Sequence, residues 1–95
     1  MSVTDLIKCL EDINTSDEIA DAEMLNYGYI TDCHQLIQDA VGLADQLLIT
    51  DDGERNIENE IELNNKGFYV FCLERDRFGW LGGAIQTDKG IIAYG

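Results

Sequence analysis

The sequence has no proline, a single histidine and only six basic residues among its 95 positions. Without proline, no segment is set apart as a rigid linker, so one domain over residues 1–95 is expected. No apolar run approaches the roughly eighteen residues that cross a bilayer, and no membrane contact is predicted. The first residues lack a basic stretch followed by an apolar one, which argues against a signal peptide. These absences predict a cytoplasmic protein.

Cysteine is scarce as well, with Cys9, Cys33 and Cys72 widely spaced along the chain. An odd set without a Cys-x-x-Cys pair is typical of a reducing compartment, where thiols serve as small hydrophobic side chains. The one histidine, His34, follows Cys33 directly. Neighbouring side chains on a helix point about 100° apart, so the pair can neither share a zinc ion nor act as nucleophile and base. No metal site is predicted.

Other catalytic patterns are missing too. Gly79, Gly82 and Gly83 do not open a helix and match neither a phosphate-binding loop nor a dinucleotide fingerprint. A calcium loop starting at Asp51 fails, because Arg55 falls at a ligand position. Carboxylates are so numerous that no pair stands out as acid and base. We predict that the protein is not an enzyme and needs no cofactor.

Residues 1–50 carry the apolar spacing of helices. Ser2 is suited to cap a first helix, with Asp5 at its third position, and a short second helix is expected over 17–26. A third helix should follow a cap at Thr31 or Asp32. The apolar stripe of the first helix is Val3, Leu6, Ile7, Leu10 and Ile13, and that of the third is Cys33, Leu36, Ile37, Ala40, Ala44, Leu47 and Leu48.

Residues 56–95 change to the spacing of strands after a turn at 50–53. From Ile57 to Leu63 the alternation fits a half-buried strand with a row of outward glutamates, although a short helix here is a real alternative. The outward row consists of Glu58, Glu60 and Glu62.

The remaining strands are expected after a hairpin-type turn at 64–67. Residues 68–73 are apolar throughout and predict a central strand covered on both faces. Strands over 78–86 and 91–94 follow, and the glycines of the first indicate a bulge or a close backbone approach. The fold class is therefore α+β: two to three N-terminal helices packed on one face of a three- to four-stranded antiparallel C-terminal sheet.

The charge is the unusual quantity. Nineteen acids give a net charge of −13, whereas solubility asks for only about 2–8 charges in a small domain. Residues 1–54 hold thirteen acids and one base, and residues 55–95 hold six acids and five bases. A field of this sign repels nucleic acid and membranes and attracts basic proteins, among which nucleic-acid-binding proteins are the commonest.

These observations predict a protein-binding module, most simply an inhibitor that engages the basic surface of a nucleic-acid-binding host protein and imitates DNA. Its size and charge are similar to those of phage anti-restriction and anti-CRISPR inhibitors, but no motif carries that comparison. Reversing the glutamate row to lysine should abolish binding without unfolding the domain. The expected partner-binding residues are Glu11, Asp12, Asp17, Glu18, Asp21, Glu23, Glu58, Glu60 and Glu62.

A second interpretation is self-assembly. In that case the acids serve only solubility, and an apolar patch on the C-terminal sheet forms a homodimer. Phe78, Trp80 and Tyr94 are the candidate anchors of such a patch.

Overall fold

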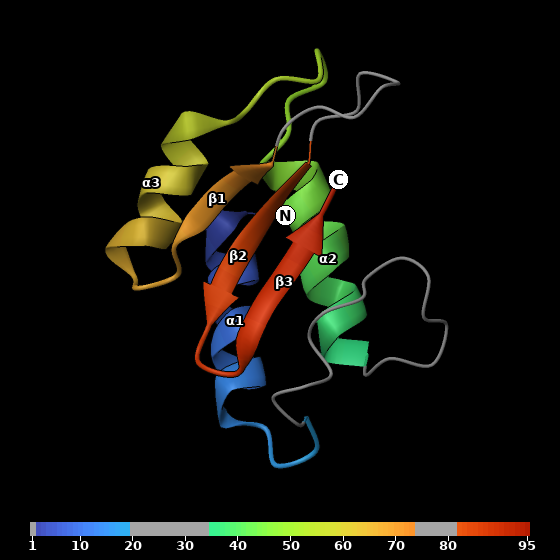
Figure 1. Cartoon of the computed structure of the whole chain (residues 1–95), viewed down its shortest axis with the longest axis vertical. Coiled ribbons are helices and arrows are strands. Elements are labelled where there is room, and N and C mark those ends of the chain that lie inside the picture. The colour runs from blue at the N-terminus through green and yellow to red at the C-terminus, as the bar shows by residue number, and fades with distance from the viewer. Residues whose placement is uncertain (1, 20–34, 74–81) are drawn as a thin grey trace.

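The computed structural model describes residues 2–19, 35–73 and 82–95, with the side chains of 72 and 73 left aside. A three-stranded antiparallel sheet forms one layer, and two helices, α1 and α2, lie behind it (Figure 1). This confirms the predicted α+β class. The elements are α1 (Val3–Thr15), α2 (Gln35–Leu47), α3 (Ile57–Asn65), β1 (Val70–Leu73), β2 (Gly82–Thr87) and β3 (Gly90–Tyr94).

Helix α1 forms as its sequence predicts. The backbone N–H of Ser2 donates to the Asp5 carboxylate at 2.9 Å, which fixes the first turn. The side chains of the predicted apolar stripe are all buried, and Leu6, Leu10 and Ile13 are fully enclosed. This stripe packs in the core shared with the sheet and α2, whereas the acidic residues of the helix, Asp5, Glu11 and Asp12, are exposed.

Helix α2 covers most of the third predicted helix. Ile37, Ala40 and Ala44 are buried in the same core as α1, and the small alanines allow close packing. The predicted cap at Thr31 or Asp32 lies outside the described residues. So does most of the helix predicted over 17–26, and its described part, residues 17–19, is not helical.

The predicted strand over 57–63 is wrong: these residues form helix α3, the alternative that the sequence left open. Asn56 caps this helix by accepting the N–H of Asn59 at 3.2 Å. Ile57 and Ile61, expected inside, are about half exposed, whereas Leu63 is fully buried. Apolar residues at 57, 61 and 63 fit the spacing of a strand as well as that of a helix. The helix is therefore identified by the residues at its ends, the capping Asn56 and the glycine at position 67.

Residues 64–67, predicted as a hairpin-type turn, form the C-terminal end of α3 instead. Gly67 has a φ of +90° and follows Lys66, the residue that caps the C-terminus of the helix. The N–H of Phe68 donates to the Leu63 carbonyl at 2.9 Å, and that of Gly67 to the Asn64 carbonyl at 3.0 Å. This is the glycine-ended helix stop in which the flanking apolar residues, Leu63 and Phe68, pack together in the core.

Strand β1 is an edge of the described sheet, so the prediction of a central strand covered on both faces is wrong. Ile85 and Ile92 pair across β2 and β3 and are buried against the helices. Phe71 and Ile91 lie on the opposite face by the alternation of the strands, and both are exposed. The side of the sheet away from the helices is therefore open at these positions.

The β2–β3 hairpin is tied to the end of α1. The N–H of Asp88 donates to the Asn14 side chain at 3.0 Å. The Lys89 ammonium donates to the carbonyl oxygens of Ser16 and Ile19. Carbonyl groups at a helix C-terminus carry partial negative charge, so the Lys89 ammonium stabilises the fold through these contacts.

Candidate functional site

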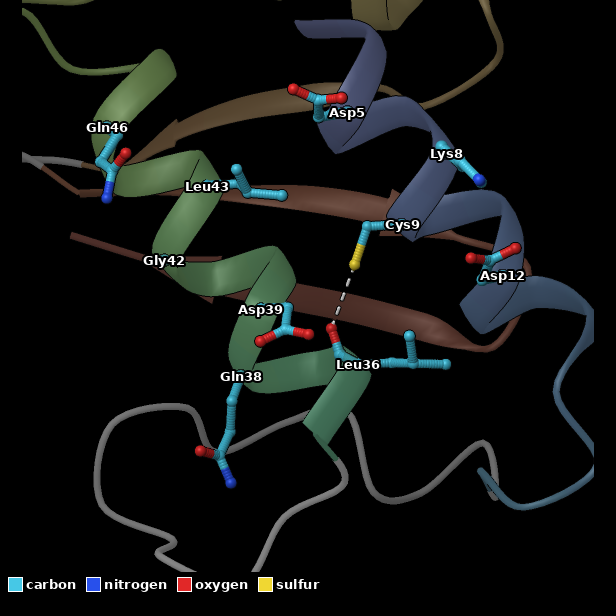
Figure 2. A pocket seen from close by; sticks show the side chains of 10 residues that line it. All are labelled: Asp5, Lys8, Cys9, Asp12, Leu36, Gln38, Asp39, Gly42, Leu43 and Gln46. Atoms are coloured by element: carbon cyan, nitrogen blue, oxygen red, sulfur yellow. Dashed lines mark hydrogen bonds between the residues drawn. The ribbon is translucent and has the colours of Figure 1, made fainter. Parts of the chain in front are cut away.

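A groove of about 470 Å³ runs between α1 and α2. Its apolar part comes from Cys9 on α1 and from Leu36 and Leu43 on α2, and in Figure 2 the Cys9 and Leu43 side chains project into the space between the helices. Polar residues complete the lining: Asp5, Lys8, Asp12, Gln38, Asp39 and Gln46. The groove thus combines an apolar interior with three carboxylates and one ammonium.

Gly42 leaves space in the wall that α2 contributes. A Cβ atom placed on Gly42 would meet no atom within 4 Å. A glycine inside a helix costs roughly 0.5–1 kcal/mol relative to alanine, and no turn requires it here. The groove is therefore open where a larger residue would close it.

The Cys9 thiol lies between the two helices, and its pKa reflects the charges around the groove. Its Sγ donates to the Leu36 carbonyl oxygen at 3.3 Å, which joins the two helices (Figure 2). The pKa of the Cys9 thiol is raised from its ordinary 9.0 to about 11, mainly by burial and additionally by the negative charges of Asp39 and then Asp12. The carboxylates of both helices therefore act on the same point between them.

This pKa predicts slow alkylation of Cys9. At pH 8 a thiol with a pKa of about 11 holds roughly a hundredfold less thiolate than one at 9.0. Site-resolved mass spectrometry should show at least that retardation against a peptide of residues 3–15. In Asp39→Asn the midpoint of the pH–rate profile should move down towards 9.0, and an unchanged midpoint would show that Asp39 does not act on the groove.

Asp45, on the exposed side of α2, has a structural role in positioning the C-terminal residue. Its carboxylate accepts the backbone N–H of Gly95 at 2.7 Å and holds the end of β3 against the helix. Partial burial raises the pKa of Asp45, and this hydrogen bond opposes the shift.

The structure separates the predicted partner-binding residues. Asp12 lines the groove, and Glu11 is exposed beside it on α1. Asp17 and Glu18 are exposed just after α1. Asp21 and Glu23 lie outside the described residues. The glutamate row is spread around α3, where Glu58 and Glu62 share one exposed side and Glu60 is turned inward.

Glu60 is a structural residue, which corrects its assignment to the binding surface. It is 5% exposed and accepts two hydrogen bonds from the Arg55 guanidinium, at 2.6 and 3.1 Å. A buried carboxylate needs such a partner. The charge reversal proposed for the whole row would therefore place a lysine in the core and destabilise the domain.

Removing the partner of Glu60 should destabilise the fold measurably. We expect Arg55→Met to lower the free energy of unfolding by about 1–3 kcal/mol, because the Glu60 carboxylate loses its guanidinium. The double variant Arg55→Met/Glu60→Leu should recover much of that loss. Urea denaturation of both variants measures it, and equal losses in the two would contradict a paired role.

Two groove carboxylates, Asp5 and Asp39, were not among the predicted binding residues. Asp5 was explained by its place in the first turn, and Asp39 carried no local signal. Asp5, Cys9 and Asp12 recur at intervals of four and three beside the buried stripe of α1. This row of polar residues with a cysteine beside the buried stripe could have indicated a groove, but the sequence does not show which other helix packs beside the row.

The predicted apolar anchors are not confirmed as a patch. Tyr94 is 3% exposed and belongs to the core, because its ring packs on Gly83 of the neighbouring strand. Phe78 and Trp80 lie outside the described residues. The exposed apolar side chains of the described sheet are instead Phe71 and Ile91, with Tyr69 just before β1.

The described residues offer neither a metal site nor a membrane span. They contain no group of three or more histidine, cysteine or acidic side chains placed to hold a metal ion. In the same ranges every helix is too short or too polar to span a bilayer. Comparison with known proteins adds no assignment: no family model, curated protein or solved structure matches the chain.

Proposed function

We propose that this protein binds a basic protein surface through the layer formed by α1 and α2, and that it acts as an inhibitor of a nucleic-acid-binding protein. One observation carries the proposal: the layer formed by α1 and α2 is acidic, whereas the strands of the sheet in front of it carry no charge. Helices α1 and α2 carry five acids and one base, whereas β1, β2 and β3 contain no charged residue.

The acids of this layer are not neutralised internally. Within the part of the chain that the structure describes, Asp5, Glu11, Asp12, Asp39 and Asp45 form no ion pair. Uncompensated like charges on one layer cost stability, and a positively charged partner offsets that cost. Electrostatic attraction of this kind raises association rates and selects partners by charge.

Nucleic-acid-binding proteins are the favoured partners because their basic surfaces are already built for a dense array of negative charge. A protein that covers such a surface competes with the nucleic acid. The proposed activity is therefore inhibition by occupation, and it requires no catalytic group.

The test is capture of partners from host lysate at about 50 mM salt, followed by elution with duplex DNA. Captured proteins should be basic, should be displaced by DNA, and should bind roughly a hundredfold or more weakly at about 300 mM salt. A captured partner whose affinity changes neither with added DNA nor with salt concentration would overturn the proposal.

A second candidate function, self-association, is favoured by the open face of the sheet. Tyr69, Phe71 and Ile91 are 60, 47 and 37% exposed there, and no charged strand residue separates them. An uncharged apolar face is where two copies of so acidic a chain could meet with least repulsion.

Sedimentation at micromolar concentration distinguishes the two functions. Self-association predicts a dimer that Phe71→Ser dissociates, since the serine removes apolar area from the interface. A monomer throughout that range would exclude the second function and leave the first unaffected.

A further inference from the structure

We infer that the groove between α1 and α2 receives an arginine side chain of the basic partner. The inference rests on the proposed function and adds to it the place and the chemistry of the anchoring contact. It follows from the composition of the groove, which joins an apolar interior to carboxylates on both walls.

The two ends of an arginine side chain match the two parts of the groove. Its aliphatic stem suits the Leu36 and Leu43 side chains, which are only half-buried and offer apolar surface. Its guanidinium presents donors along two edges, so it can bind carboxylates on opposite walls, Asp12 from α1 and Asp39 from α2.

Arginine is favoured over lysine by the same surroundings. A guanidinium is more weakly hydrated than an ammonium and loses less on entering a partly apolar groove. Its planar fork also satisfies two acceptors at once, whereas an ammonium acts as a point charge.

Among the described residues that line the groove, the basic side chain is that of Lys8. Lys8 lies on the rim, and in Figure 2 its side chain points away from α2. Among the described residues neither Asp12 nor Asp39 forms an ion pair, although Asp39 accepts a hydrogen bond from Gln35 at 2.8 Å. The negative charges of both carboxylates raise the pKa of the Cys9 thiol, so a cation bound beside that thiol would be attracted by both.

Gly42 permits a test that leaves the charge untouched. Gly42→Leu places a side chain in the open part of the groove and keeps the net charge at −13. The substitution should not impair folding, because leucine is a better helix former than glycine. Gly42→Ala adds a single methyl group to the same open space and is the matched control.

The probe is a labelled eight-residue peptide of alternating glycine and arginine, with a lysine counterpart, followed by fluorescence anisotropy at about 50 mM salt. Gly42→Leu should weaken binding of the arginine peptide about tenfold or more, and Gly42→Ala by less than about twofold. Wild-type protein should bind the lysine peptide at least about threefold more weakly than the arginine peptide. Thermal melting followed by circular dichroism verifies that both variants fold.

The outcomes separate this inference from the function on which it rests. Wild-type affinity in folded Gly42→Leu overturns insertion into the groove, and equal affinity for the two peptides overturns the assignment to arginine. Neither result touches the proposed function. That function fails separately if affinity for the captured partner does not respond to salt.

Discussion

Gly83→Ala should lower the free energy of unfolding by about 1–3 kcal/mol, the range expected for overpacking a core. Gly83 lies opposite Tyr94 in the β2–β3 ladder, and the tyrosine ring rests on the glycine. A Cβ atom at position 83 would fall inside van der Waals contact with that ring, 2.8 Å from Cε1 and closer still to Cζ and Oη. Because Tyr94 is itself buried, its ring can move only by disturbing its neighbours.

The same substitution at Gly42 should have the opposite sign. There the added methyl group meets open space, and replacing a helical glycine by alanine is worth roughly 0.5–1 kcal/mol. Urea denaturation of the two variants provides the comparison. In a Tyr94→Leu background the cost of Gly83→Ala should largely disappear, and an undiminished cost would show that the ring is not its cause.

Reversing two groove carboxylates should have the largest effect on binding. We expect Asp12→Lys/Asp39→Lys to weaken affinity for the captured partner by at least about a hundredfold, because two attractive contacts become repulsive. The measurement is an equilibrium titration at about 150 mM salt, where charges further apart than roughly 8 Å are largely screened.

The matched control is Asp51→Lys/Asp52→Lys, which gives the same net charge of −9 but changes exposed turn residues outside the groove. This control should weaken binding by less than about tenfold. Equal losses in the two double variants would mean that only total charge matters, which would contradict a localised contact.

Much of the fold was predictable because local signals agreed with tertiary packing. In α1 the Ser2 cap, Asp5 and the apolar stripe all indicate one helix, and the structure forms it. The β2–β3 hairpin likewise follows from a short polar turn between apolar runs. Agreement across such levels is what makes a local prediction dependable.

Errors arose where one pattern fits two structures. The alternation from Ile57 to Leu63 suits a strand, but Asn56 and Gly67 start and stop a helix there. The apolar run at 68–73 looked covered on both faces, whereas Phe71 is 47% exposed on an edge strand. Periodicity describes one segment at a time and does not say what covers it.

The candidate groove depends on the pairing of two helices that are separated in sequence by residues 16–34. Asp12 was predicted as a binding residue from charge alone, whereas Asp39 becomes its neighbour across the groove only through the packing of α1 against α2. Glu60 shows the reverse case, because its inward turn towards Arg55 removes it from the surface.

Hydrogen exchange of this protein with and without its captured partner tests the contact surface most directly. The proposed contact predicts that the partner slows amide exchange in α1 and α2, most strongly in the helical turns that contain Asp12 and Asp39. Exchange in β2 and β3 should change little. Protection concentrated in the strands instead, with α1 and α2 unchanged, would contradict it.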